Sequence, residues 1–108
     1  MELIKKALVG VVNEPHGTGT RARLDQIRVA GKTGTSQVIA LPEKRELARE
    51  KDVPYKFRDH AWFVAVAPAE NPAIALAILM EHSGTGGSLA APIAKKILEC
   101  YFQKARLL

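Results

Sequence analysis

The sequence predicts an α+β fold, in which antiparallel sheet strands are flanked by an N-terminal and a C-terminal helix. Two apolar runs of strand length, 61–67 and 73–80, are separated by a short turn that contains two prolines, which is typical of a hairpin. Apolar residues recur at helical spacing at both ends of the chain. Its 108 residues are enough for one small domain.

The first helix is expected over Met1–Asn13, because charged residues there lie opposite a regular apolar face. That face consists of Leu3, Ile4, Ala7, Leu8, Val11 and Val12. Proline and glycine over 13–19 predict a loop. A short strand or turn should follow over 20–25, with Ala22 and Leu24 facing a core.

The first long strand is expected over Ile27–Val38, where valines and threonines flank Gly34. Glycine inside a strand often marks the close approach of a ligand or of another backbone. Lys32 adds a positive charge beside two threonine hydroxyls, so this stretch is predicted to be an anion-binding edge. A long polar connection, 39–58, follows, and its mixed charges over Glu43–Lys51 indicate a helical turn or two.

The hairpin strands are continuously apolar, which is typical of strands covered on both faces. Two helices are too few for this, so we expect further cover from residues outside this chain. The last helix should begin at an N-cap, Ser88, with Pro92 in its first turn. Its sheet-facing residues are expected to be Leu89, Ile93, Ile97 and Tyr101. We expect Cys100 to pack as a small apolar residue and 102–108 to fray.

Composition argues against several functional classes. The net charge of +5 comes from dispersed lysines and arginines, without an aromatic platform, which favours a basic surface over a nucleic-acid site. One cysteine excludes an internal disulfide and a cysteine-based metal site, and the three histidines lack ligand spacing, so no metal or cofactor is expected. No apolar run approaches the roughly 20 residues of a membrane span.

Two phosphate-binding motifs fail on context. Gly31-Lys32-Thr33 resembles the end of a phosphate-binding loop, but residue 26 is glutamine and the surroundings are extended. Gly17-Thr18-Gly19-Thr20-Arg21-Ala22 matches a dinucleotide fingerprint only loosely, and it follows a helix instead of a strand. Asp59 and His60 are adjacent; a base dyad is conceivable, but a turn capped by Asp59 with a hydrogen-bonded His60 is the favoured interpretation.

No activated nucleophile is visible, because none of the three serines begins Ser-x-x-Lys or lies in Gly-x-Ser-x-Gly. Lys32-Thr33-Gly34 is more informative, since Lys-Thr-Gly accompanies Ser-x-x-Lys in penicillin-recognising serine enzymes. Its setting inside a strand, before a hairpin and a terminal helix, strengthens this match.

With these residues, the chain resembles the C-terminal part of the transpeptidase domain of penicillin-binding proteins. The stretches 29–38 and 58–63 resemble the elongation type of that family, and Gly86-Gly87, Ala90–Ala94 and the upstream 11–12 and 17–20 also fit. The weakest match lies over 41–56. We therefore expect 1–108 to be a single incomplete domain with part of the β-lactamase/transpeptidase-like fold.

The resemblance implies roles for four residues. Lys32 would supply positive charge near the serine side of the site, and the hydroxyls of Thr33 and Thr35 would bind a substrate carboxylate. Gly34 would leave room for the ligand, and the backbone N–H of Thr35 would form half of an oxyanion hole. The nucleophilic serine with its lysine, and a Ser-x-Asn element, should lie upstream of Met1, so this chain alone should not react with penicillin.

The family further implies a peptidoglycan stem peptide and β-lactams as ligands, and cell-elongation proteins as partners. The parent protein is expected in the cell inner membrane, held by an N-terminal span, with this domain on the periplasmic side. Three alternatives remain open: a division-type penicillin-binding protein, a β-lactam sensor, and a non-catalytic binding module with the same fold. Exposed sheet surface would favour association or domain swapping of the piece alone.

Overall fold

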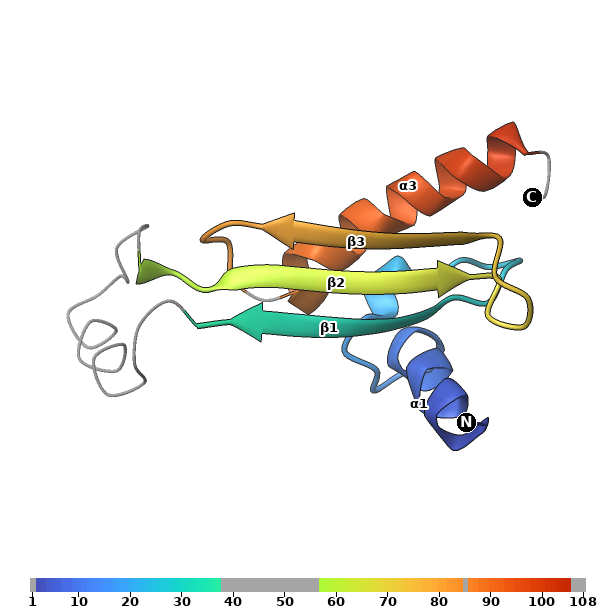
Figure 1. The fold of residues 1–108 in the computed structure, drawn as a ribbon, viewed down its shortest axis with the longest axis horizontal. Helices are drawn as coiled ribbons and strands as arrows, with labels where there is room; N and C mark the ends of the chain where they lie inside the picture. The colour runs from blue at the N-terminus through green and yellow to red at the C-terminus, as the bar shows by residue number, and fades with distance from the viewer. Residues whose placement is uncertain (1, 38–56, 85, 106–108) are drawn as a thin grey trace.

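The computed structural model describes residues 2–37, 57–84 and 86–105. The elements, in chain order, are helix α1 (Glu2–Asn13), the 3-10 turn η1 (Thr20–Ala22), strands β1 (Ala30–Ser36), β2 (His60–Ala67) and β3 (Ile74–Met80), the π-helical turn η3 (Gly86–Ala90) and helix α3 (Ala91–Lys104) (Figure 1). The predicted α+β class and the order of helix, three strands and helix are confirmed. The helical turns expected over Glu43–Lys51 fall outside the described residues.

The three strands form an antiparallel sheet in the order β1-β2-β3. Gly34 of β1 lies opposite Trp62 of β2, and Phe63 of β2 lies opposite Ile78 of β3. Strand β2 is therefore central, while β1 is an edge of the described sheet. At such an edge, alternate backbone N–H and C=O groups face away from the neighbouring strand.

Helix α3 covers one face of the sheet (Figure 1). Alternate residues of β2 point to that face and are buried, and Phe63 among them is fully buried. The helix presents a stripe of small and large apolar side chains, all fully buried: Ala91, Ala94, Leu98 and Phe102. The alanines bring the helix backbone close to the sheet, so Leu98 and Phe102 reach the core beside Phe63.

The sequence-based assignment of the buried face of this helix was wrong. The stripe expected to face the sheet is 36–42% exposed and consists of Leu89, Ile93, Ile97 and Tyr101. The helix is rotated so that its alanine-containing stripe packs instead. Phe102 was expected to fray, but it lies within α3 and is fully buried.

Two further details of the helix differ from expectation. Ser88 is not the N-cap, because it lies within η3, and α3 begins three residues later behind Ala90, which makes no side-chain cap. Pro92 does lie in the first turn, where its missing N–H has no helical partner to lose. Cys100 is exposed and does not pack as a core residue.

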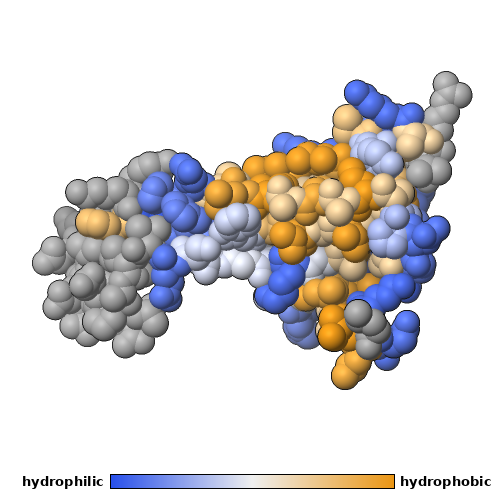
Figure 2. Space-filling model, viewed as in Figure 1, coloured by the Kyte–Doolittle hydropathy of each residue, from blue (hydrophilic) through white to orange (hydrophobic). Residues whose placement is uncertain are grey.

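The opposite face of the sheet is open in the described part of the chain. Figure 2 shows an apolar band across the strands on this side. Val64 and Leu79 on this face are 44% and 45% exposed, and the indole of Trp62 beside them is 37% exposed. Cover on both faces, which the apolar strands predicted, is therefore present on one face only among these residues.

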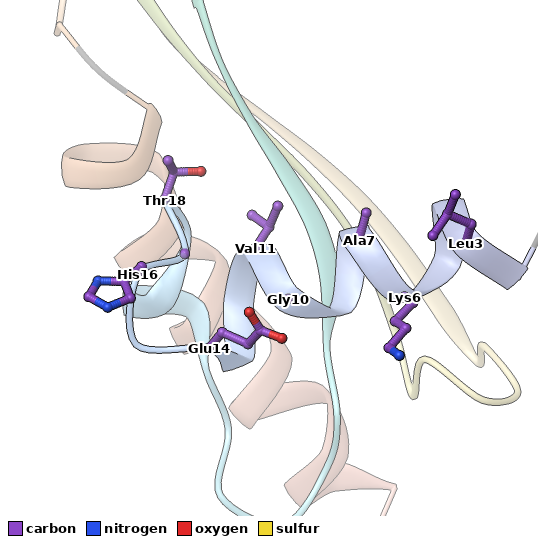
Figure 3. A pocket seen from close by; sticks show the side chains of 9 residues that line it. Leu3, Lys6, Ala7, Gly10, Val11, Glu14, His16 and Thr18 are labelled. Carbon is purple, nitrogen blue, oxygen red and sulfur yellow. The ribbon is translucent and has the colours of Figure 1, made fainter.

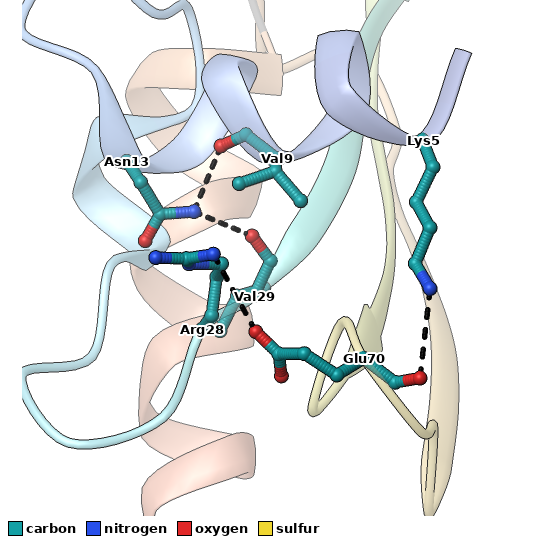
Figure 4. A network of polar contacts seen from close by, with 6 residues as sticks. All are labelled: Lys5, Val9, Asn13, Arg28, Val29 and Glu70. Atoms are coloured by element: carbon teal, nitrogen blue, oxygen red, sulfur yellow. Dashed lines mark hydrogen bonds and ion pairs between the residues drawn. The ribbon is translucent and has the colours of Figure 1, made fainter. Parts of the chain in front are cut away.

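Helix α1 is attached to the sheet by its C-terminal end. Val12 is fully buried, whereas Leu3 and Ile4 at the other end are 80% and 61% exposed, although they were predicted to belong to the buried face. The side-chain amide of Asn13 donates hydrogen bonds to the carbonyls of Val9 and Val29, each at 2.8 Å (Figure 4). This bridge fixes the end of α1 against the residue that precedes β1.

Residues between α1 and β1 complete the core. Ala22 and Leu24 are buried, as expected, and of the predicted short strand or turn the segment forms a turn, η1. Two basic side chains contact Glu70, which lies in the turn between β2 and β3. Arg28 forms an exposed ion pair with its carboxylate at 3.6 Å, and the Lys5 Nζ donates a hydrogen bond of 3.5 Å to its backbone carbonyl (Figure 4).

Candidate active site along strand β1

The four residues singled out by the sequence lie consecutively in the middle of β1. Lys32, Thr33, Gly34 and Thr35 are all in extended backbone, which excludes the loop-to-helix setting of a phosphate-binding loop. Lys32 and Thr35 are exposed, and Thr33 and Gly34 are half-buried. The strand thus presents a cation and two hydroxyls at the edge of the sheet.

These four residues divide between the two faces of the sheet. Lys32 lies opposite Val64 and Gly34 opposite Trp62, so both belong to the open face. Thr33 lies opposite Phe63, and Thr35 opposite Ala61, on the face covered by α3. A ligand therefore meets both the ammonium and the hydroxyls only by lying along the edge of β1.

The ammonium of Lys32 folds back over its own strand. Its Nζ donates a hydrogen bond of 2.7 Å to the carbonyl of Thr33. The residue also lines an apolar hollow of about 200 Å³ between α1 and the open face, together with Leu8 and Val64 among others. The lysine stem is thus supported by apolar contacts while the charge stays near the strand edge.

Gly34 leaves free space on the open face. A Cβ at this position would lie 3.4 Å from the Cβ of Trp62, with no other heavy atom of the described residues within 4 Å. At Gly31 the situation is reversed, because a Cβ would lie 2.7 Å from the Phe63 ring and 2.9 Å from the Val64 carbonyl oxygen. Gly31 is a packing requirement, whereas Gly34 keeps the strand surface open.

Sequence reasoning missed Thr18. Its hydroxyl lies 2.9 Å from the hydroxyl of Thr33, so the loop after α1 reaches the Lys-Thr-Gly strand. Thr18 also ends a groove of about 440 Å³ that follows α1 from Leu3 (Figure 3). The available signal was the Gly17-Thr18-Gly19 sequence, which fits the family but by itself assigns no role to Thr18.

Asp59 and His60 have structural hydrogen bonds. The Nδ1 of His60 accepts a 2.9 Å bond from the backbone N–H of His82, and the carbonyl of Asp59 accepts from the Gly84 N–H at 3.0 Å. The two histidine rings meet edge to face with centroids 4.5 Å apart. These contacts tie the start of β2 to the loop after β3, and the hydrogen bond of His60 agrees with the structural interpretation of this residue.

The described ranges contain no cluster of three or more His, Cys, Asp or Glu side chains that could hold a metal ion. Within the same ranges, no helix has the length and apolar character needed to cross a membrane.

The family is shown by direct comparison. A model of the penicillin-binding protein transpeptidase domain matches residues 1–99. This match defines the class: the chain belongs to the penicillin-binding protein transpeptidase domain family.

Relatives within the family narrow the resemblance to the elongation type. The chain is 40% identical over 104 residues to the peptidoglycan D,D-transpeptidase MrdA of Haemophilus influenzae, which covers 95% of this chain and 16% of the relative. The chain therefore spans about one sixth of the length of this relative.

Solved structures share the fold. The D,D-transpeptidase domain of a peptidoglycan glycosyltransferase from Eggerthella lenta is 32% identical with a TM-score of 0.70, over 96% of this chain and 20% of that one. Penicillin-binding protein 2 of Helicobacter pylori, solved in complex with MreC, is 33% identical with a TM-score of 0.65, over 92% and 17%. Penicillin-binding protein A of Mycobacterium tuberculosis, solved as a ceftriaxone acyl-enzyme, is 30% identical with a TM-score of 0.63, over 89% and 19%.

Proposed function

We propose that this chain supplies the Lys-Thr-Gly wall of the active site of a peptidoglycan D,D-transpeptidase, within a longer protein. The observation that carries the proposal is the edge position of β1, which presents Lys32 and Thr35 to solvent beside the open Gly34. Relatives at 40% identity that are named as this enzyme support it.

The reaction requires a serine outside this chain. That serine attacks the carbonyl between the two D-alanines of a stem peptide and forms an acyl-enzyme, and the terminal D-alanine leaves. An amine of a neighbouring strand then attacks the ester, which forms the cross-link and releases the serine. A β-lactam acylates the same serine.

The residues of β1 have separate tasks in this reaction. Lys32 places positive charge beside the nucleophile and the substrate carboxylate, and the hydroxyls of Thr33 and Thr35 bind that carboxylate. The backbone N–H of Thr35 donates to the developing oxyanion, where a pre-aimed donor is most effective. Gly34 admits the extended peptide alongside β1, in the manner of an added strand.

We expect the segment that carries the serine to dock on the open face of the sheet. Lys32 and Gly34 share this face with Trp62 and Val64, so the segment that carries the serine approaches from the open side of the sheet. Such a segment would also cover the apolar band of Figure 2.

The elongation machinery is the proposed setting. The Helicobacter pylori relative was solved with MreC, which supports a partner of that kind for the parent protein. Its proposed location is the inner membrane, with this domain on the periplasmic side.

Labelling with a fluorescent penicillin tests the proposal. The full-length protein should be labelled covalently, whereas residues 1–108 alone should remain unlabelled because the nucleophile is absent. If no penicillin labels the full-length protein, the proposed transpeptidase activity is wrong, and the alternative of a non-catalytic binding module with this fold is favoured.

A further inference from the structure

A hydroxyl outside the Lys-Thr-Gly strand is bonded directly to it. Thr18 and Thr33 are separated by 15 residues, yet their Oγ1 atoms lie 2.9 Å apart. Thr18 is exposed and Thr33 is half-buried, so the pair lies at the surface. A ligand bound along the edge of β1 is therefore within reach of this pair.

The backbone on either side of Thr18 is held in place. The N–H of Gly17 donates to the Glu14 carbonyl at 3.0 Å, and the N–H of Gly19 donates to the Val11 carbonyl at 2.9 Å. A Cβ at Gly17 would lie 2.1 Å from the Val11 carbonyl oxygen, and one at Gly19 would lie 2.9 Å from the Phe63 ring. The turn is therefore fixed against α1 and the core.

A second segment, η3, packs against Thr18 and Thr33 through Gly87. A Cβ at Gly87 would lie 2.2 Å from the Thr18 carbonyl oxygen and 3.7 Å from the Thr33 Cγ2. Gly87 thus packs against Thr18 and near the methyl group of Thr33. Glycines from two distant segments thus let the chain pack closely around Thr18, and in this arrangement its hydroxyl lies 2.9 Å from that of Thr33.

The chemistry of a hydroxyl makes this contact directional. Each hydroxyl has one proton to donate and two lone pairs. When Thr18 donates to the Thr33 Oγ1, the proton of Thr33 is left for another acceptor, and the hydrogen bond that Thr33 receives makes it a better donor. A carboxylate is the acceptor that gains most, because charge-assisted hydrogen bonds are the stronger ones.

We propose that Thr18 is a positioning residue that orients the Thr33 hydroxyl toward the carboxylate of the stem peptide or β-lactam. The inference rests on the proposed function, because Thr33 must bind a carboxylate for its orientation to matter. Thr18 acts through Thr33 and does not itself contact the ligand.

The test measures acylation of the full-length protein by a penicillin, with the dissociation constant of the initial complex separated from the acylation rate at saturation. Thr18→Val removes the hydroxyl at nearly constant volume and should weaken the initial complex about tenfold, as expected for a hydrogen bond to a charged group. Thr18→Ser should restore binding. The matched control, Thr20→Val, should bind as the wild type does, since its hydroxyl makes no hydrogen bond within the described residues.

Two comparisons separate orientation from a structural role. The methyl ester of the same penicillin lacks the carboxylate charge, so its binding should be nearly insensitive to Thr18→Val. In a Thr33→Val background, Thr18→Val should cause no further loss, because the residue through which it acts is gone.

Each other outcome is informative. Equal losses for penicillin and its ester, or a failure of serine to rescue, would overturn orientation and leave a packing role. Additive losses in the double variant would show that Thr18 binds the ligand itself. If penicillin labels the wild type and Thr18→Val binds it with an unchanged dissociation constant, this inference alone is overturned. If penicillin does not label the wild type, the proposed function is overturned and this inference with it.

Discussion

The ring of Phe63 occupies the space into which a side chain at Gly31 would project. The two residues lie on adjacent strands, and a Cβ on Gly31 would come within 2.7 Å of the ring Cζ. Phe63 is fully buried below this point and cannot move outward without opening the core. The glycine that leads into the Lys-Thr-Gly sequence is therefore required by packing.

Gly31→Ala should destabilise the full-length protein by about 1–3 kcal/mol, because overpacking displaces the ring and the Val64 carbonyl. Gly10→Ala is the control: the three atoms nearest to its Cβ would belong to the flexible Glu14 carboxylate, at 3.4 Å or more, and alanine favours a helix. Denaturant unfolding of both variants measures the difference. Equal midpoints would show that the core yields at Gly31 without cost.

Gly34→Ala should have the opposite profile. A methyl group there makes an ordinary contact with Trp62, so stability should change by less than about 1 kcal/mol. It does, however, occupy the strand surface along which the peptide lies, so penicillin acylation should fall at least about tenfold. Unchanged acylation would mean that the ligand does not approach β1 on this face.

Lys32→Ala should slow acylation of the full-length protein about a hundredfold or more, as expected when one electrostatic stabiliser of the transition state is removed. Lys32 is exposed and bonds only to a neighbouring carbonyl among the described residues, so the thermal unfolding midpoint should hardly move. Stopped-flow acylation and calorimetry together decide the matter. If Lys32→Ala is acylated at the wild-type rate, Lys32 is not part of the active site.

The bridge from Asn13 offers a test of how α1 is attached. Asn13→Ala leaves the Val29 carbonyl without its side-chain donor and should cost about 1–3 kcal/mol of unfolding free energy. Arg28→Ala breaks a nearby ion pair whose side chains are 60% and 62% exposed, and should cost less than about 1 kcal/mol. A larger loss of unfolding free energy for Arg28→Ala than for Asn13→Ala would show that the ion pair, and not the Asn13 bridge, contributes more to stability.

Adjacent residues of α3 test which stripe of the helix is buried. Leu98→Ala should cost about 2–5 kcal/mol, since the side chain is fully buried. Ile97 is 42% exposed, so Ile97→Ala should cost clearly less. If Leu98→Ala and Ile97→Ala lower the unfolding free energy of the full-length protein equally, Ile97 is also buried there, against a part of the protein outside this chain.

The element order and the strand position of Lys32 were predictable because they depend on local patterns. Continuous apolar runs identified β2 and β3, and the valines and threonines around Gly34 identified β1. The short turn between the two runs identified them as a hairpin. These features need no information about residues far away in the sequence.

The buried stripe of α3 was not predictable in this way. Two stripes at helical spacing compete, and the more apolar one contains Leu89 and Ile97, whereas the stripe that packs contains Ala91 and Ala94. Hydrophobicity favours the first stripe, but the closeness of helix and sheet favours small residues, and this closeness depends on the tertiary arrangement. The pairing of Thr18 with Thr33 is similarly long-range.

Trp62 is the only tryptophan among the 108 residues, and it lies directly across from Gly34 with 37% of its surface exposed. Its indole therefore sits on the face where the nucleophile-bearing segment is proposed to dock. Indole emission shifts to shorter wavelength as water leaves its surroundings. This part of the protein thus contains an intrinsic fluorophore whose emission reports, without any label, whether the open face is wet or covered.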